Sequence, residues 1–230
     1  MLAEHGDDPN TEERYSDMGR FDDEFVAQMD DVDRLIERTE DPLHRRILIN
    51  FRRHGLLEVS GRYDELLAPE MTVEHPVYRL FEDGEAILLD GMDQVRGFYQ
   101  SLAEIDMLVM WIKDAKIAVG DWGFAGEVLF SQFIPGRMMS GKVFSNVAAG
   151  GDLTESEVFD ADAWYLVRRT LCFNWPYDAA GRMIGEHVYE DSLSRTVERV
   201  DEADVIDGAR AIELLTPVID RYGLPPLIDA

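Results

Sequence analysis

The chain has 230 residues, of which 46% are hydrophobic, and this is enough apolar material for one domain with a real core. Asp and Glu number 47 against 22 Lys and Arg, so the formal net charge is −25 at pH 7. A surface this acidic repels phosphate backbones and anionic lipids, which argues against nucleic acid and membranes as partners. The single cysteine, Cys172, allows no internal disulfide and fits a reducing compartment.

The N-terminal twenty residues are acidic and polar, the opposite of the basic and then apolar pattern of a signal peptide. No run of residues approaches the roughly 20 apolar positions that a membrane helix needs. We therefore expect a cytoplasmic protein with a disordered acidic segment over residues 1–20.

The next part of the chain is predicted to be helical. Between Asp22 and Glu40, apolar residues recur at the spacing of an amphipathic helix. Pro42 marks the first turn of a second helix, where its missing N–H costs nothing. A short third helix is expected over residues 62–67. One stripe of the second helix combines Ile47, Phe51, His54 and Glu58.

The stretch that follows places a histidine at the end of a predicted strand. Met71, Val73 and His75 alternate with polar residues, so one strand face is apolar and ends on an imidazole. Pro76 then ends regular pairing. A half-buried imidazole there could give or take a proton near neutral pH. The alternative is a strand-end histidine that binds a backbone carbonyl.

After a turn at residues 82–84, a helix follows Asp90-Gly91, and its stripe contains Val95, Phe98, Tyr99 and Leu102. Strands are expected over residues 108–119, 123–133, 164–173 and 183–189, with a turn at 178–181 joining the last two. A final helix is expected over residues 209–222. Helices followed by a run of strands predict an α+β layout.

Residues 135–163 form a long segment with several glycines and a proline at its start, and it has Met138 and Met139 among polar neighbours. A loop of this length is usually a lid, an interface arm or disordered. Because methionines adapt to irregular apolar ligands, we expect a lid or a dimer arm. The predicted organisation is a tail over 1–20, a domain over 21–200 that contains this insertion, and a helical tail over 201–230.

The order of these segments resembles the nuclear-transport-factor-2-like superfamily, and within it the SnoaL-like and ketosteroid-isomerase-like group. The resemblance covers about residues 42–191 and rests on three segments. They are Asn50-Phe51-Arg52-Arg53-His54 leading to Thr72-Val73-Glu74-His75-Pro76, then Leu89 to Tyr99, and then Asp178 to Arg182 leading into Ile184 to Tyr189. The resemblance implies a cone-shaped, curled mixed sheet whose helices close an apolar pocket, with extra N- and C-terminal helices. This fold hosts many activities.

The functional residues of the family map only in part onto this chain. The catalytic aspartate of ketosteroid isomerases corresponds to His75, while their two oxyanion donors correspond to Phe51 and Phe173, which cannot donate. Steroid isomerase activity is therefore not expected. The histidine of related dehydratases falls at Trp111. The Asp-Arg-Asp set of epoxide-hydrolase relatives is matched only in part, by Arg168 and Glu186.

Strand alternation puts Glu186 on the inward face of the last strand. A carboxylate in an apolar cone has a raised pKa or pairs with a cation such as Arg168 or His75. A purely structural ion pair between Glu186 and Arg168 is the alternative. His54 shares a helix face with Phe51, where it would be a catalyst or a core hydrogen-bond partner.

Two functional hypotheses remain open. The first is a cofactor-independent isomerase, dehydratase or cyclase that acts by proton transfer on an apolar small molecule, polycyclic or terpenoid-like. The second is a non-catalytic module that binds a hydrophobic ligand or forms a dimer.

The motifs of metal, phosphate and Ser-His-Asp sites do not occur, so no metal or cofactor is expected. The resemblance implies a homodimer. The candidate catalytic residues are His75, Glu186, Arg168 and His54, and the candidate substrate-binding residues are Phe51, Val73, Trp111, Phe130, Phe173, Trp175 and Val188.

Overall fold

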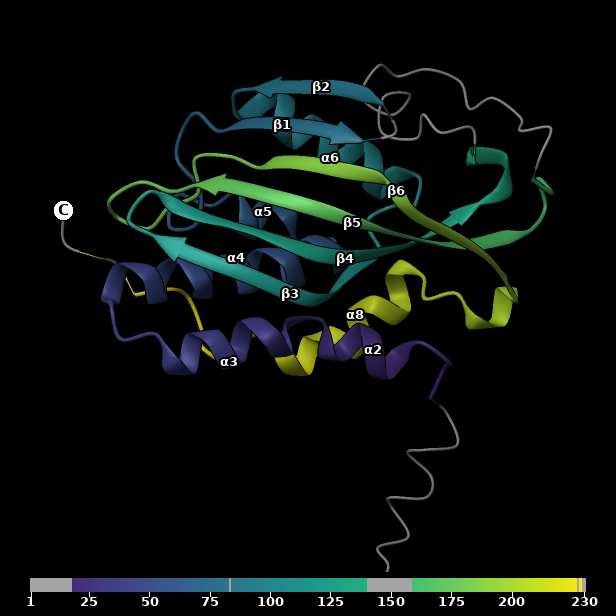
Figure 1. The fold of residues 1–230 in the computed structure, drawn as a ribbon, viewed down its shortest axis with the longest axis horizontal. Coiled ribbons are helices and arrows are strands. Elements are labelled where there is room, and N and C mark those ends of the chain that lie inside the picture. Colours follow the sequence, from purple (N-terminus) through teal and green to yellow (C-terminus); the bar gives the residue numbers. More distant parts are fainter. Residues whose placement is uncertain (1–17, 83, 140–158, 227, 229–230) are drawn as a thin grey trace, which may run out of the picture.

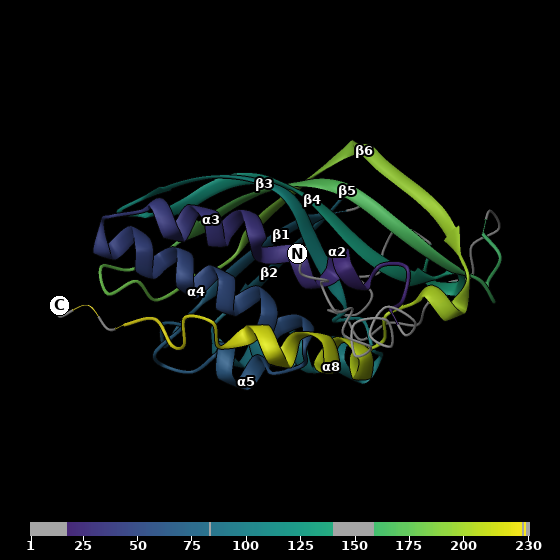
Figure 2. The ribbon, with the colours of Figure 1, turned by 90° about the horizontal axis from the view of Figure 1, so that it is seen from below.

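The computed structural model describes residues 18–82, 84–139, 159–226 and 228. In this part of the chain, a six-stranded sheet in the order β2-β1-β6-β5-β4-β3 curls over a layer of helices (Figures 1 and 2). The predicted fold class is therefore confirmed: the fold is α+β, with a curled, unclosed mixed sheet and N-terminal helices on its concave side. The predicted disordered segment over 1–20 falls almost entirely outside the described residues.

The N-terminal helices follow the predicted order, with one break. The first predicted helix is divided into α2 (Asp22–Val26), the 3₁₀ helix η1 (Ala27–Met29) and α3 (Asp30–Arg38). The next helices are α4 (Pro42–Val59) and α5 (Tyr63–Leu66). Asp41 caps α4, since its side chain accepts hydrogen bonds from the backbone N–H groups of Leu43 and His44. Helix α4 is buried along most of its length and forms one wall of the interior.

The strands are β1 (Val77–Glu82), β2 (Glu85–Asp90), β3 (Met110–Gly120), β4 (Gly123–Pro135), β5 (Trp164–Pro176) and β6 (His187–Val200). β1 pairs with β6 in parallel, and every other named pair is antiparallel. The β1–β2 hairpin was not predicted. The predicted strand over 183–189 was placed too early, because the strand begins at His187 and extends to Val200.

Gly185 explains how the chain reaches β6. A Cβ at this position would lie 1.8 Å from the carbonyl oxygen of Val77, so only glycine lets the two backbones approach this closely. The backbone N–H of Arg79 then donates to the carbonyl of Glu186 at 2.7 Å. The side chain of Glu186 is thereby fixed at the point where the chain enters the sheet.

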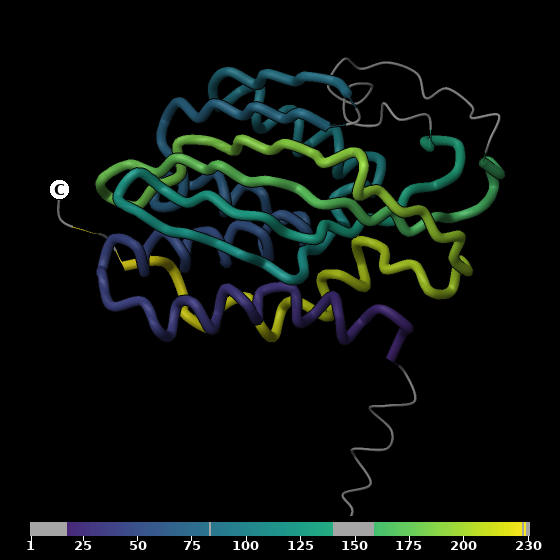
Figure 3. Tube along the Cα trace, viewed as in Figure 1, coloured from purple at the N-terminus to yellow at the C-terminus, as the bar shows by residue number. Residues whose placement is uncertain are grey.

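The remaining described helices are α6 (Met92–Glu104), η2 (Gly136–Met138), η3 (Glu202–Asp204) and α8 (Gly208–Ile219). Figure 3 shows the C-terminal part of the chain returning beside the N-terminal helices, where Arg52 of α4 donates to the carbonyls of Val218 and Ile219. Among the described residues, no helix combines the length and the apolarity needed to span a bilayer.

The two described ends of the 135–163 segment are packed. The backbone N–H of Gly136 donates to the carbonyl of Ala163 at 2.8 Å, and Met138 is buried. Residues 140–158 lie outside the described part of the chain, so the lid or dimer arm stays a prediction. A homodimer also stays a prediction, although β1, β2 and β6 carry the exposed apolar side chains of Phe81, Leu88, Tyr189, Leu193 and Val197.

Candidate functional site

A cavity of about 70 Å³ lies between the helices and the concave face of the sheet. Most of its wall is apolar and aromatic, and its polar lining residues are Gln28, Glu58, Glu82 and Glu186. The structure places six of the predicted substrate-binding residues in this wall: Phe51, Trp111, Phe130, Phe173, Trp175 and Val188. Val73 is not among the lining residues, because it lies before β1 and binds the carbonyl of Met183 through its backbone N–H.

The polar centre of the site joins His54 to Glu186. The Nε2 atom of His54, on α4, lies 3.0 Å from Oε1 of Glu186. The same Nε2 atom is 3.4 Å from Oε2 of Glu58, one helical turn further along α4. The side chain of His54 is 1% exposed and that of Glu186 is 8% exposed. A single buried imidazole therefore bridges two carboxyl groups that both face the cavity.

The surroundings of the cluster raise the pKa values of both His54 and Glu58. Burial by itself lowers the pKa of His54, but the neighbouring carboxyl groups of Glu186 and Glu58 outweigh it and raise this pKa to about 9. Burial raises the pKa of Glu58, so this carboxyl group holds its proton to higher pH than an exposed glutamate does. At neutral pH the cluster therefore contains a protonated histidine, and the environment of Glu58 favours its neutral, acidic form.

Two tyrosines complete the cluster. The hydroxyl of Tyr99, on α6, donates to Oε1 of Glu186 at 2.7 Å, and it lies 3.2 Å from the hydroxyl of Tyr78 on β1. Burial raises the pKa of both tyrosines well above the usual range, so both remain neutral hydrogen-bond donors. We did not predict a role for Tyr78, Tyr99 or Glu58. The sequence does indicate that Tyr99 and Glu58 face the interior, since each shares a helical stripe with apolar residues.

A second buried ion pair borders the cavity. Arg169 donates to Oε2 of Glu82 at 2.6 Å, and its guanidinium stacks over the ring of Phe130 at 4.9 Å. Glu190 lies further along β6, 3.8 Å from Nε of Arg169. Arg169 and His54 are not among the lining residues, so the wall itself contains three acidic side chains and no basic one.

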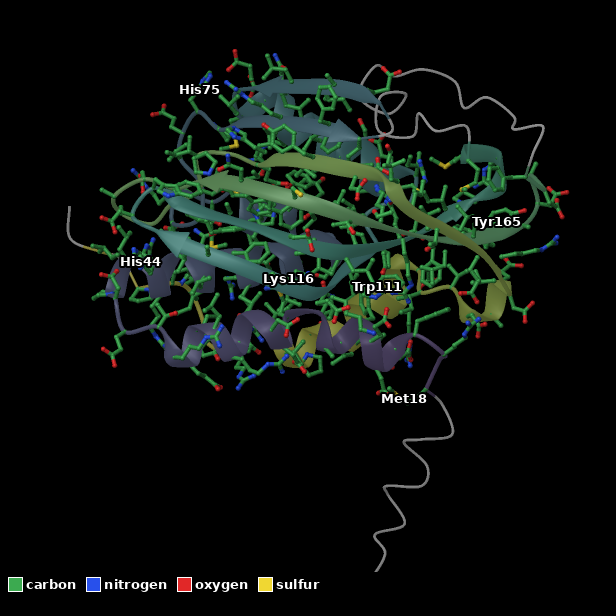
Figure 4. All side chains as sticks on the ribbon, viewed as in Figure 1. Met18, His44, His75, Trp111, Lys116 and Tyr165 are labelled. Carbon is green, nitrogen blue, oxygen red and sulfur yellow. The ribbon has the colours of Figure 1, made fainter. Side chains whose placement is uncertain are left out.

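His75 does not belong to this site, contrary to its predicted position at the end of an inward face. Its side chain is 70% exposed, and Nε2 pairs with Oδ1 of Asp90 at 2.8 Å. The physical reason is that the stretch before Pro76 makes only an isolated bridge at Thr72, so strand alternation does not apply there. Figure 4 shows His75 at the outer edge of the fold near β2, far from Trp111.

Arg168 is also placed elsewhere. It pairs with Glu24 at 2.6 Å, donates to the hydroxyl of Ser131 at 2.9 Å and stacks over Trp111 at 5.7 Å. The predicted pairing of Arg168 with Glu186 is therefore wrong, and His54 is the cation that Glu186 meets. The buried arginine of β5 is the next residue, Arg169, which pairs with Glu82. The β5–β6 register shifts between Arg168 and Thr170, where alternation is locally broken.

The described residues contain no group of three His, Cys, Asp or Glu side chains arranged to hold a metal ion. What the cluster offers instead is two buried carboxyl groups, an imidazole and tyrosine hydroxyls beside an apolar cavity. Such a set can hold or move a proton at a bound molecule.

Comparisons with known proteins add little to this geometry. No family model matches the chain, and no curated protein matches it. Among solved structures, it is similar to SalBIII, an epoxide hydrolase/cyclase-like enzyme with a role in pyran ring formation in the polyether salinomycin. That similarity has 12% identity and a TM-score of 0.39, and it covers 63% of this chain and 90% of that chain.

The chain is also similar to a phenazine biosynthesis-related protein from Pseudomonas aeruginosa, with 13% identity and a TM-score of 0.35. This similarity covers 75% of this chain and 85% of that chain. At these values neither likeness bears on the chemistry of the cavity. The element order and the curled sheet agree with the nuclear-transport-factor-2-like cone that the sequence implies.

Proposed function

We propose that the protein is a cofactor-independent enzyme that moves a proton within a compact apolar molecule, as an isomerase, dehydratase or cyclase. The observation that carries this proposal is Glu186, a buried carboxyl group in the wall of a mostly apolar cavity, held by His54 at 3.0 Å. A positioned base of this kind contributes a rate factor of roughly 10²–10⁴.

In this proposal Glu186 is the general base and Glu58 is the general acid. Both meet His54, but their environments differ, since Glu186 also accepts from the hydroxyl of Tyr99, whereas burial raises the pKa of Glu58. Carboxyl pairs with separated proton affinities are the usual arrangement for acid and base roles. His54 contacts both and acts as a positioning residue.

A dehydration illustrates the separate roles of the base and the acid. Glu186 takes the proton from a carbon next to the one that carries a hydroxyl, and the electron pair of that C–H bond forms the new double bond. Glu58 gives its proton to the departing hydroxyl, which leaves as water. An isomerisation uses the same two groups, with the proton returned to a different carbon.

The size of the cavity narrows the expected substrate. Its volume of about 70 Å³ is far below the roughly 300–1,000 Å³ of sites for drug-sized ligands. A compact apolar molecule therefore fits this form of the protein better than the polycyclic or terpenoid-like molecule expected from the sequence.

The test is a panel of compact ketones, alcohols and epoxides incubated with the protein in D₂O and followed by NMR. We expect deuterium incorporation or elimination for at least one compound, and a loss of about two to four decades in rate for Glu186→Gln. The matched control is Glu74→Gln, because Glu74 is exposed and lies outside this cavity. Equal rates for the wild type and Glu186→Gln would rule out the assigned base.

The small volume also supports the second hypothesis, a module that binds a hydrophobic ligand without converting it. The same panel separates the two. A binding module would show saturable ligand shifts in the NMR spectrum and no change in any compound.

A further inference from the structure

The lining of the cavity discriminates against negative charge. Glu58, Glu82 and Glu186 all contribute to the wall, and each of them pairs with a buried cation that lies outside the lining. Arg169 is held by Glu82, and His54 is held between Glu58 and Glu186. A carboxylate or phosphate inside would lose its hydration and lie among three acidic side chains, so an anionic ligand is disfavoured.

Trp175 supplies a second, independent observation about the ligand. Its side chain lines the cavity, the residue is 3% exposed, and its indole Nε1 has no hydrogen-bond partner among the described residues. Its ring lies 4.8 Å from that of His54, centroid to centroid. A buried N–H without an acceptor is costly, and a ligand atom with a lone pair would satisfy it.

These two observations together select one functional group. A protonated amine can donate to the carboxylates but has no lone pair for Trp175. A ketone or ether can accept from Trp175 but has no proton for a carboxylate. A hydroxyl does both, because it is one donor and two acceptor sites on one atom.

We infer that the cavity recognises a compact apolar alcohol, whose hydroxyl accepts from the indole N–H of Trp175 and donates to Glu186. This assignment deepens the proposed function because it concerns the same cavity. It is measured by binding alone, so its failure is separate from a failure to find turnover.

The experiment uses four probes with equal numbers of non-hydrogen atoms: cyclopentanol, cyclopentylamine, isobutyrate and methylcyclopentane. Dissociation constants are measured by NMR titration of the full chain at neutral pH. We expect cyclopentanol to bind at least about tenfold more tightly than each of the other three. Equal or tighter binding of any one of the other three would overturn the inference.

Trp175→Phe keeps the aromatic wall and removes only the donor. Cyclopentanol affinity should fall about tenfold in this variant, whereas methylcyclopentane affinity should not fall. The control is Trp122→Phe, since Trp122 is 50% exposed and lies outside the cavity lining. Unchanged cyclopentanol affinity in folded Trp175→Phe would contradict the assignment.

A spectroscopic readout covers the case in which Trp175→Phe does not fold. In the wild type, the indole N–H resonance of Trp175 should move downfield when cyclopentanol is added and should not move downfield with methylcyclopentane. A resonance that responds equally to both probes would show that the indole makes no hydrogen bond to the hydroxyl.

Discussion

Oε1 of Glu186 accepts from two donors that come from different helices, Nε2 of His54 at 3.0 Å and the hydroxyl of Tyr99 at 2.7 Å. The carboxylate is thus fixed from α4 and α6 while the residue itself sits at the entry to β6. Groups that are oriented before a substrate arrives need no reorganisation during the reaction. The geometry of this residue therefore depends on three separate elements of the fold.

The charge on His54 makes stability depend on pH. Its pKa is about 9 in the folded protein, compared with 6.5 for an ordinary histidine, so the folded state binds this proton more tightly. The resulting stabilisation is fully present below pH 6.5 and is lost as pH rises through 9. We expect the free energy of unfolding, measured with urea, to fall by about 3 kcal/mol across that pH window.

His54→Gln should remove this pH dependence. The variant should also be less stable at pH 6 by about 3 kcal/mol, because two buried carboxyl groups lose their cation. A variant with the same slope of stability against pH as the wild type would show that another group causes the slope.

Gly185 and Gly97 form a matched pair of substitutions. Gly185→Ala should destabilise by more than about 2 kcal/mol, since its Cβ would overlap the carbonyl of Val77. Gly97→Ala meets no atom within 4 Å in helix α6 and should stabilise by about 0.5–1 kcal/mol. Thermal melts of both variants test the pair, and equal changes would contradict the close approach at Gly185.

Gly55 controls the space in the cavity. A Cβ there would lie 2.3 Å from Cε of Met29, the end of a flexible side chain that lines the same cavity. Gly55→Ala should therefore fold with a melting temperature close to that of the wild type, while Met29 shifts and the cavity shrinks. Cyclopentanol affinity should fall at least about tenfold, and unchanged affinity would place the ligand elsewhere.

His75 now serves as a negative control. Because its pair with Asp90 is exposed, His75→Gln should change stability by less than about 1 kcal/mol and leave turnover unchanged. A loss of turnover in a folded His75→Gln variant would restore the original assignment and contradict the site described above.

Local patterns predicted much of the fold. Helical spacing identified α4 and α6, and runs of β-branched and aromatic residues identified β3, β4 and β5. The β1–β2 hairpin was missed because it follows the proline-terminated stretch at Pro76. The start of β6 was missed because it is set by the contact of Gly185 with Val77, which is distant in sequence.

The site was predicted where helical spacing or strand alternation holds. Phe173, Trp175 and Val188 lie on regular strands, and the structure places all three on the cavity wall. Arg168 was misplaced because the register shifts in its neighbourhood, and His75 because its segment is not a strand. The partnership of His54 with Glu186 joins residues 132 positions apart in the chain, since 186 − 54 = 132, and no local pattern encodes it.

The most direct test of the proposed function is the pH profile of kcat/KM for the best compound of the panel. In the wild type, activity should fall as pH rises through the raised pKa of Glu58, because the acid then loses its proton. Glu58→Gln should lose about two to four decades and show no such fall, and Glu186→Gln should lose a similar factor while still binding the ligand. Folded Glu186→Gln protein with the activity and pH profile of the wild type would contradict the account.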